Sequence, residues 1–177
     1  MGFFDKLKGV KEPQPGTAPI PPAELHQRLL SLNSDQVPFT VNAGAGGEEG
    51  DVVAEWKIVD AKWLEIFAQA GLEKTHRIYL TLDPRENEAR VLEESWDVSW
   101  RAGVPEIRLS AEAFRGRTMG SKSFGTAYAF KGVNPLDYGQ VYNYRFDVSE
   151  MKDPLAEVVT RSGWTFRPVM SKNKLVD

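Results

Sequence analysis

The residues best suited to chemistry are three cations grouped in one short segment. Arg115, Arg117 and Lys122 lie within RGRTMGSK, together with two hydroxyl residues and two glycines. Arginine offers a planar set of N–H donors to a phosphate or carboxylate, and glycines allow backbone N–H groups to point at an anion. The segment therefore predicts a site for an anionic group. Its spacing matches no established phosphate loop, so a solvated loop is the competing interpretation.

Aromatic residues supply a second candidate surface. Tyr128, Tyr142 and Tyr144 lie on predicted strands, and a buried phenol needs a hydrogen-bond partner that a ligand can provide. One interpretation is a cavity that these rings line together with the five tryptophans of the chain, for an apolar or planar ligand. The other is a solid core, because the periodicity also demands burial at every tryptophan: Trp56, Trp63, Trp96, Trp100 and Trp164.

Catalytic chemistry has little support in the sequence. The chain has no cysteine and only two histidines, His26 and His76, and no acids stand at a triad or zinc-site spacing from them. A carboxylate pair for glycoside hydrolysis is conceivable among Glu93, Glu94 and Asp97. Strand alternation, however, places Asp97 opposite the aromatic face. We therefore expect no cofactor and no metal, and the sequence favours a function without catalysis.

The N-terminus has the pattern of a basic amphipathic helix. Phe3, Phe4 and Leu7 fall on one side of such a helix, and Lys6 and Lys8 fall mostly elsewhere. This pattern predicts docking to a membrane surface or to a partner. Helices shorter than about 12 residues are marginal in water, so a frayed or domain-docked terminus is the alternative. The next stretch, KEPQPGTAPIPP, contains five prolines and predicts an extended spacer.

The remaining periodicity predicts one α+β domain over residues 23–170. It follows the amphipathic start and proline-rich linker at 1–22 and precedes a polar tail at 171–177. Two stretches, 51–83 and 138–169, each predict a strand, a short helix, a glycine stop and a second strand. Consecutive strands without intervening helices indicate a mostly antiparallel, curved sheet of seven or eight strands carrying two or three short helices.

Local signals place the ends of several elements. Pro22 suits the first turn of a helix that runs through Leu32, and Pro38 confines the strand at 37–41 to a sheet edge. Asp153-Pro154 predicts the beginning of the last helix. Glu93-Glu94 interrupts the alternation of the strand at 89–101 and predicts a bulge.

Composition limits the functional classes. The net charge of -3 over 177 residues lacks the basic excess of nucleic-acid binders, so we expect no nucleic-acid partner. No run approaches the roughly 20 apolar residues that span a bilayer, and the first residues lack the features of a secretory signal. We expect a soluble cytoplasmic protein whose contact with a membrane, through its N-terminus, is peripheral.

Together these patterns predict a non-catalytic cytoplasmic binding or adaptor module for a protein partner, tethered by its N-terminal segment. The alternative is a small-ligand-binding protein with an aromatic-lined cavity and the arginine and lysine loop for an anionic group. A hydrolase-type enzyme is the least favoured function.

Overall fold

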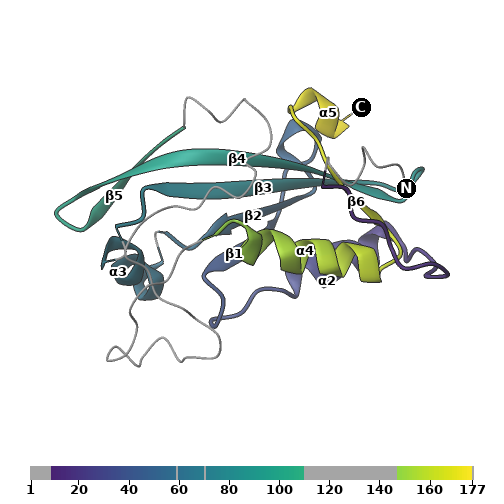
Figure 1. Cartoon of the computed structure of the whole chain (residues 1–177), viewed down its shortest axis with the longest axis horizontal. Helices are drawn as coiled ribbons and strands as arrows, with labels where there is room; N and C mark the ends of the chain where they lie inside the picture. Colours follow the sequence, from purple (N-terminus) through teal and green to yellow (C-terminus); the bar gives the residue numbers. More distant parts are fainter. Residues whose placement is uncertain (1–8, 59, 70, 110–146, 177) are drawn as a thin grey trace.

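The computed structural model describes residues 9–58, 60–69, 71–109 and 147–176. Within these ranges six strands form one sheet in the order β1-β2-β3-β4-β5, with β6 paired to β4 (Figure 1). The pairings are antiparallel except that of β6, which lies parallel to β4. The strands are β1 (Phe39–Ala43), β2 (Val52–Trp56), β3 (Lys74–Asp83), β4 (Glu88–Arg101), β5 (Val104–Leu109) and β6 (Thr165–Pro168).

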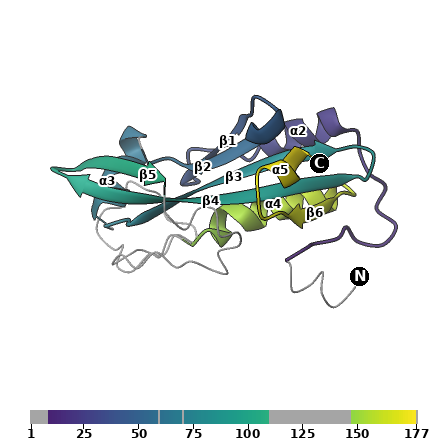
Figure 2. The ribbon, with the colours of Figure 1, turned by 90° about the horizontal axis from the view of Figure 1, so that it is seen from above.

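Helices cover both faces of this sheet to different extents. Helices α2 and α4 lie against one face, which we call the inner face, and the short α5 lies on the opposite, outer face (Figures 1 and 2). Helix α3 connects β2 to β3, which are antiparallel neighbours. The helices are α2 (Pro22–Leu30), α3 (Ala61–Gln69), α4 (Ser149–Arg161) and α5 (Asn173–Val176), with one 3-10 turn, η1 (Gly47–Glu49).

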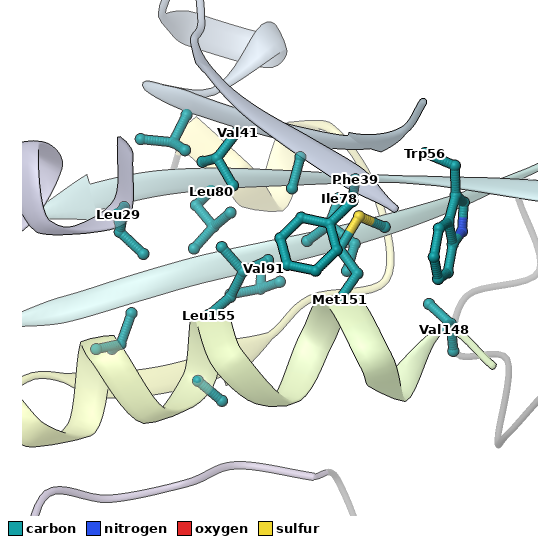
Figure 3. Close-up of a cluster of buried hydrophobic side chains, with 14 of the residues drawn as sticks. Leu29, Phe39, Val41, Trp56, Ile78, Leu80, Val91, Val148, Met151 and Leu155 are labelled. Carbon is teal, nitrogen blue, oxygen red and sulfur yellow. The ribbon is translucent and has the colours of Figure 1, made fainter. Parts of the chain in front are cut away.

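The main core lies between the inner face and helices α2 and α4. Figure 3 shows Met151 and Leu155 of α4 directed toward the strands, where Ile78, Leu80 and Val91 meet them. These five side chains are no more than 2% exposed, and burying an aliphatic side chain stabilises a fold by about 1.5–3 kcal/mol. Alternate side chains of β2 and β3 are therefore apolar because they are buried between the sheet and helices α2 and α4.

The edge strand β1 is closed by a side chain from the loop after α2. The Asn33 amide donates to the Val41 carbonyl oxygen at 2.6 Å, and its own oxygen accepts the Val41 N–H at 2.8 Å. Exposed strand edges are prone to pairing with other chains. Asn33 thus satisfies the part of the edge that the sheet leaves open, and the predicted edge position of this strand is confirmed.

The proline-rich segment contacts the domain near its two ends, at Val10 and Lys11 and again at residues 18–20, while most side chains between them are exposed. Val10 is buried, and Lys11 exchanges two backbone hydrogen bonds with Phe166 of β6, at 2.9 and 2.8 Å. Further along, the Ile20 carbonyl oxygen accepts the indole N–H of Trp164 at 2.8 Å. The sequence predicts a spacer here, whereas these contacts hold the segment along β6 and the end of α4.

The α+β class and the mostly antiparallel sheet are confirmed, and three finer predictions are wrong. The sheet has six strands within the described ranges, rather than seven or eight. Helix α4 begins at Ser149 and contains Pro154, because the Asp147 carboxylate accepts the Ser149 N–H at 2.9 Å and Met151 is fully buried one turn before the proline. The predicted bulge at Glu93-Glu94 is replaced by a continuous ladder with β3.

The C-terminal segment, polar in sequence, also has structure. Helix α5 follows Lys172, and its Leu175 is fully buried against the outer face. No helix in the described part of the chain is long and apolar enough to cross a membrane.

Candidate binding surface on the outer face

The outer face carries charged and aromatic side chains from three neighbouring strands. Side chains alternate along each strand, so the register decides which of them meet. Arg77 of β3 lies opposite Glu55 of β2 and opposite Glu94 of β4. Tyr79 is the next outward residue of β3, and Trp96 is the next outward residue of β4. The sheet thus brings five polar or amphipathic groups onto one surface.

These groups form a connected network. The Arg77 guanidinium lies 2.8 Å from the Glu55 carboxylate and 5.1 Å from the centre of the Trp96 ring. The Tyr79 hydroxyl donates to one oxygen of Glu94 at 2.9 Å, and the Lys172 ammonium lies 3.2 Å from the other. Guanidinium groups over indole faces are attracted by the ring quadrupole. Charge therefore alternates across the face, from Glu55 to Lys172.

Burial differs along this network. Glu94 is only 3% exposed, which is tolerable for a carboxylate because both of its oxygens have partners. Burial raises the pKa of Tyr79, and the Glu94 carboxylate raises it further, so the phenol remains a neutral donor. Burial opposes the charge of Arg77, but its hydrogen bond with Tyr79 and the nearby Glu55 raise the pKa of this guanidinium overall. Arg77 and Glu55 remain about 40% exposed and can contact a partner.

A groove of about 570 Å³ crosses this face. Its lining includes Arg77, Tyr79 and Trp96 from the sheet, Glu49 of η1, and Lys172 before α5. The indole nitrogen of Trp96 is buried and has no hydrogen-bond acceptor among the described residues. The groove can bind through ion pairs, ring contacts and hydrogen bonds. The described residues contain no group of three or more histidines and acids placed to hold a metal.

A second polar cluster lies on the inner face. Glu93 contacts the Lys152 ammonium of α4 at 3.1 Å and the ring nitrogen Nδ1 of His76 at 3.7 Å. Burial lowers the pKa of His76, although Glu93 acts in the opposite direction. His76 is 1% exposed and Glu93 is nearly as buried, whereas the Lys152 side chain is 24% exposed and links the cluster to solvent. Its evident role is to join α4 to the sheet.

The tandem glutamates are thus divided between the two faces. Glu93 points inward to Lys152, and Glu94 points outward to Lys172. Because the two carboxylates lie on opposite sides of the sheet, they cannot act together as the acid and base of a glycosidase. The sequence shows the adjacent pair, but only the lysines from α4 and from the segment before α5 explain it.

The tryptophans also divide into two groups. Trp56, Trp63 and Trp164 are buried as predicted, and Trp56 makes edge-to-face contact with Phe67 at 6.2 Å. The prediction of core burial is wrong for Trp96 and incomplete for Trp100. Trp96 lines the outer groove, and Trp100 is partly exposed while its indole N–H donates to the Leu72 carbonyl oxygen at 2.8 Å.

The site residues predicted from sequence lie outside the described residues, so they stay predictions. They are the anion-site residues Arg115, Arg117 and Lys122, the ring residues Tyr128, Tyr142 and Tyr144, and the docking residues Phe3, Phe4, Lys6, Leu7 and Lys8. Sequence reasoning names Glu94 as a candidate acid and Trp96 as an aromatic residue of a core or cavity, but it misses Glu55, Arg77 and Tyr79 as site residues. Alternation alone places Arg77 with Tyr79 and Glu94 with Trp96, but it does not identify which face is left open.

Comparison with models of known families, with curated proteins and with solved structures found no match to this chain.

Proposed function

We propose that this chain is a non-catalytic binding module that receives a protein partner on the outer face of its sheet. The observation that carries the proposal is the group formed by Arg77, Tyr79 and Trp96 in the groove, where Arg77 and Trp96 are partly exposed and Tyr79 is buried beside them. Arginine, tyrosine and tryptophan are the residue types that dominate the binding energy of protein interfaces. Here they meet on one rigid surface.

The shape of the groove favours a protein over a small molecule. Small-ligand sites are concave, mostly apolar and enclose most of the ligand surface. This groove extends across the sheet from η1 to β5, and three carboxylates, a guanidinium and an ammonium line it. Such an arrangement suits the polar contacts around an interface centre. Its volume of about 570 Å³ also lies in the range of small-ligand sites, which keeps an anionic or planar ligand as the second candidate.

The test is affinity capture from the source organism with single-residue variants of the full chain. Arg77→Ala and Trp96→Ala remove the centre of the surface, and Arg101→Ala is the matched control because its side chain is 86% exposed at the hairpin between β4 and β5. A partner bound by the native chain and by Arg101→Ala, and weakened at least about tenfold by the other two, supports the proposal. Capture that none of the variants changes would refute it.

Native mass spectrometry of the purified chain separates the two candidates. A retained small mass that disappears in Trp96→Ala would replace the protein partner by a small ligand. A bare chain mass, together with a partner lost in Arg77→Ala, would support the module.

A second part of the proposal concerns the N-terminal segment, which we propose as a tether. Its support is the sequence pattern of Phe3, Phe4 and Leu7, together with the anchoring of Val10 and Lys11 beside β6. With the chain held there, a tether would be attached within a few residues of the domain. Co-sedimentation with vesicles containing anionic lipid tests this, comparing the native chain with a Phe3→Ala, Phe4→Ala variant. Equal pelleting of the two proteins would refute the tether.

A further inference from the structure

The C-terminal segment already occupies part of the outer face. Leu175 is fully buried with Tyr79 and Leu92, and Val53 and Val169 pack against this small cluster. Three residues before Leu175, the Lys172 ammonium contacts Glu94 at 3.2 Å and lies 5.6 Å from the Tyr79 ring. The segment 169–176 therefore docks chiefly through the Lys172 ammonium and the Leu175 side chain, with Val169 packed beside them and α5 in contact with η1. Figure 2 shows α5 over the sheet beside the long strands β3 and β4.

This docking is small in extent. Helix α5 has four residues, and a helix of this length has no stability of its own in water. The other apolar side chain of α5, Val176, is 47% exposed, and Met170, which precedes the helix, is 62% exposed, so these two side chains contribute little to the docking. The buried Leu175, the packing and backbone hydrogen bond of Val169, the Lys172 ion pair and the contacts of α5 with η1 must together offset the entropy of ordering the whole segment. Such segments open locally without unfolding of the domain.

Opening would change the charge of the groove. With Lys172 in place, Glu49, Glu55 and Glu94 share the groove with two cations. Without Lys172, three carboxylates face Arg77 alone, and Glu94 loses the partner of one oxygen. The vacated surface would also expose Tyr79 and Leu92. It would then favour a ligand that supplies both a cation and an apolar side chain.

We propose that the segment 169–176 is a built-in competitor for the partner surface. The inference rests on the proposed function and specifies its partner. The partner presents a lysine or arginine and a large apolar residue one helical turn apart, and it displaces α5 by taking the places of Lys172 and Leu175. The segment of this chain shows the pattern that the surface accepts, Lys-x-x-Leu.

The test measures binding of a fluorescent peptide with the sequence Pro168–Asp177 to the full-length protein. The native chain is compared with a Leu175→Ala variant, in which the internal competitor is weakened. If the docked state holds about 90% of the native population, the variant binds the peptide about tenfold more tightly. Two changes should each weaken binding of the peptide to the Leu175→Ala protein. The first is alanine in place of leucine at the position of the peptide that corresponds to Leu175, and the second is Glu94→Gln in the protein.

Several results would overturn the inference. Equal peptide affinity of the native and Leu175→Ala proteins, or binding to neither, would show that α5 blocks no binding surface. A concentration-dependent dimer of the native chain that exchanges its own C-terminal segment would replace the separate partner by a second copy.

Hydrogen exchange on the native protein provides evidence that does not depend on a variant folding. The amides of Lys174 and Leu175 should exchange at least about tenfold faster than those of Tyr79 and Leu92, through local opening. Exchange of all four amides only by global unfolding would refute the competitor. These measurements use purified protein and peptide, so they can fail while capture through Arg77 and Trp96 succeeds, and the reverse.

Discussion

Replacing Gly163 by alanine tests whether the N-terminal segment is part of the fold. Gly163 follows α4 with φ +77°, a conformation that costs a residue with a side chain about 1–2 kcal/mol. An added Cβ would also lie 2.5 Å from the Ala18 carbonyl oxygen and 2.6 Å from the Pro19 nitrogen. These are backbone atoms, so the segment 18–20 must move. The movement would disturb the hydrogen bond from Trp164 to Ile20.

The expected cost is the sum of two effects. The backbone conformation accounts for about 1–2 kcal/mol, and overpacking against main-chain atoms adds about 1–3 kcal/mol. Gly71 provides the matched control. It follows α3 with φ +58°, and a Cβ there would meet nothing within 4 Å. Gly71→Ala should therefore cost only the conformational part.

Equilibrium unfolding in urea, followed by tryptophan fluorescence, measures both variants. We expect the free energy of unfolding to fall by about 1–3 kcal/mol more in Gly163→Ala than in Gly71→Ala. Limited proteolysis should show faster cleavage within residues 12–20 of Gly163→Ala. Equal losses of stability in the two variants, with equal cleavage, would refute the packing of this segment against the end of α4.

Two further predictions concern titration and the sheet edge. Burial raises the pKa of Glu150 to about 7, from 4.5 when unfolded, so the stability gained by keeping it protonated is complete below pH 4.5 and is lost as the pH rises toward 7. Glu150→Gln should therefore gain stability relative to the native chain by about 1 kcal/mol between pH 5 and pH 8, after allowance for solvent screening. The titration of His76 affects the stability of both proteins equally, so it cancels in the comparison. A difference in the free energy of unfolding in urea that does not change with pH would contradict the prediction. Asn33→Ala should lower the free energy of unfolding by about 1–2 kcal/mol and increase light scattering, because it opens the β1 edge at Val41. Asn33→Asp should give an intermediate result, because it keeps the oxygen that accepts the Val41 N–H. Unchanged stability and scattering would contradict this role of Asn33.

The two adjacent glutamates of β4 show how one strand joins three layers. Glu93 holds Lys152 of α4 beneath the sheet, and Glu94 holds Lys172 above it. Both carboxylates are nearly buried, so each depends on its lysine to avoid an uncompensated charge. The inner pair contributes to the body of the fold. The outer pair belongs to the segment that we propose a partner displaces, which is why we assign it to binding.

The sequence by itself determined the elements whose signals are local. Alternation in β2, β3 and β4 identifies these strands, and glycines at 71 and 163 mark the ends of α3 and α4 with positive φ. Both signals depend on residues close together along the chain, so they can be recognised without knowing which distant segments these elements pack against. The start of α4 was misplaced because the competing signals, the Asp147 carboxylate and the burial of Met151, depend on the surrounding structure.

Only the tertiary structure decided which face of the sheet is covered and which is open. Alternation separates two sets of side chains, but it gives both sets the same period, so it cannot place α4 beneath Glu93 or α5 above Glu94. Leu175 had no local signal at all, because a four-residue helix in a polar stretch is formed by the surface it lies on. The outer groove exists because α4 packs on one face of the sheet and α5 covers only part of the other, and both contacts join segments that are distant in the sequence.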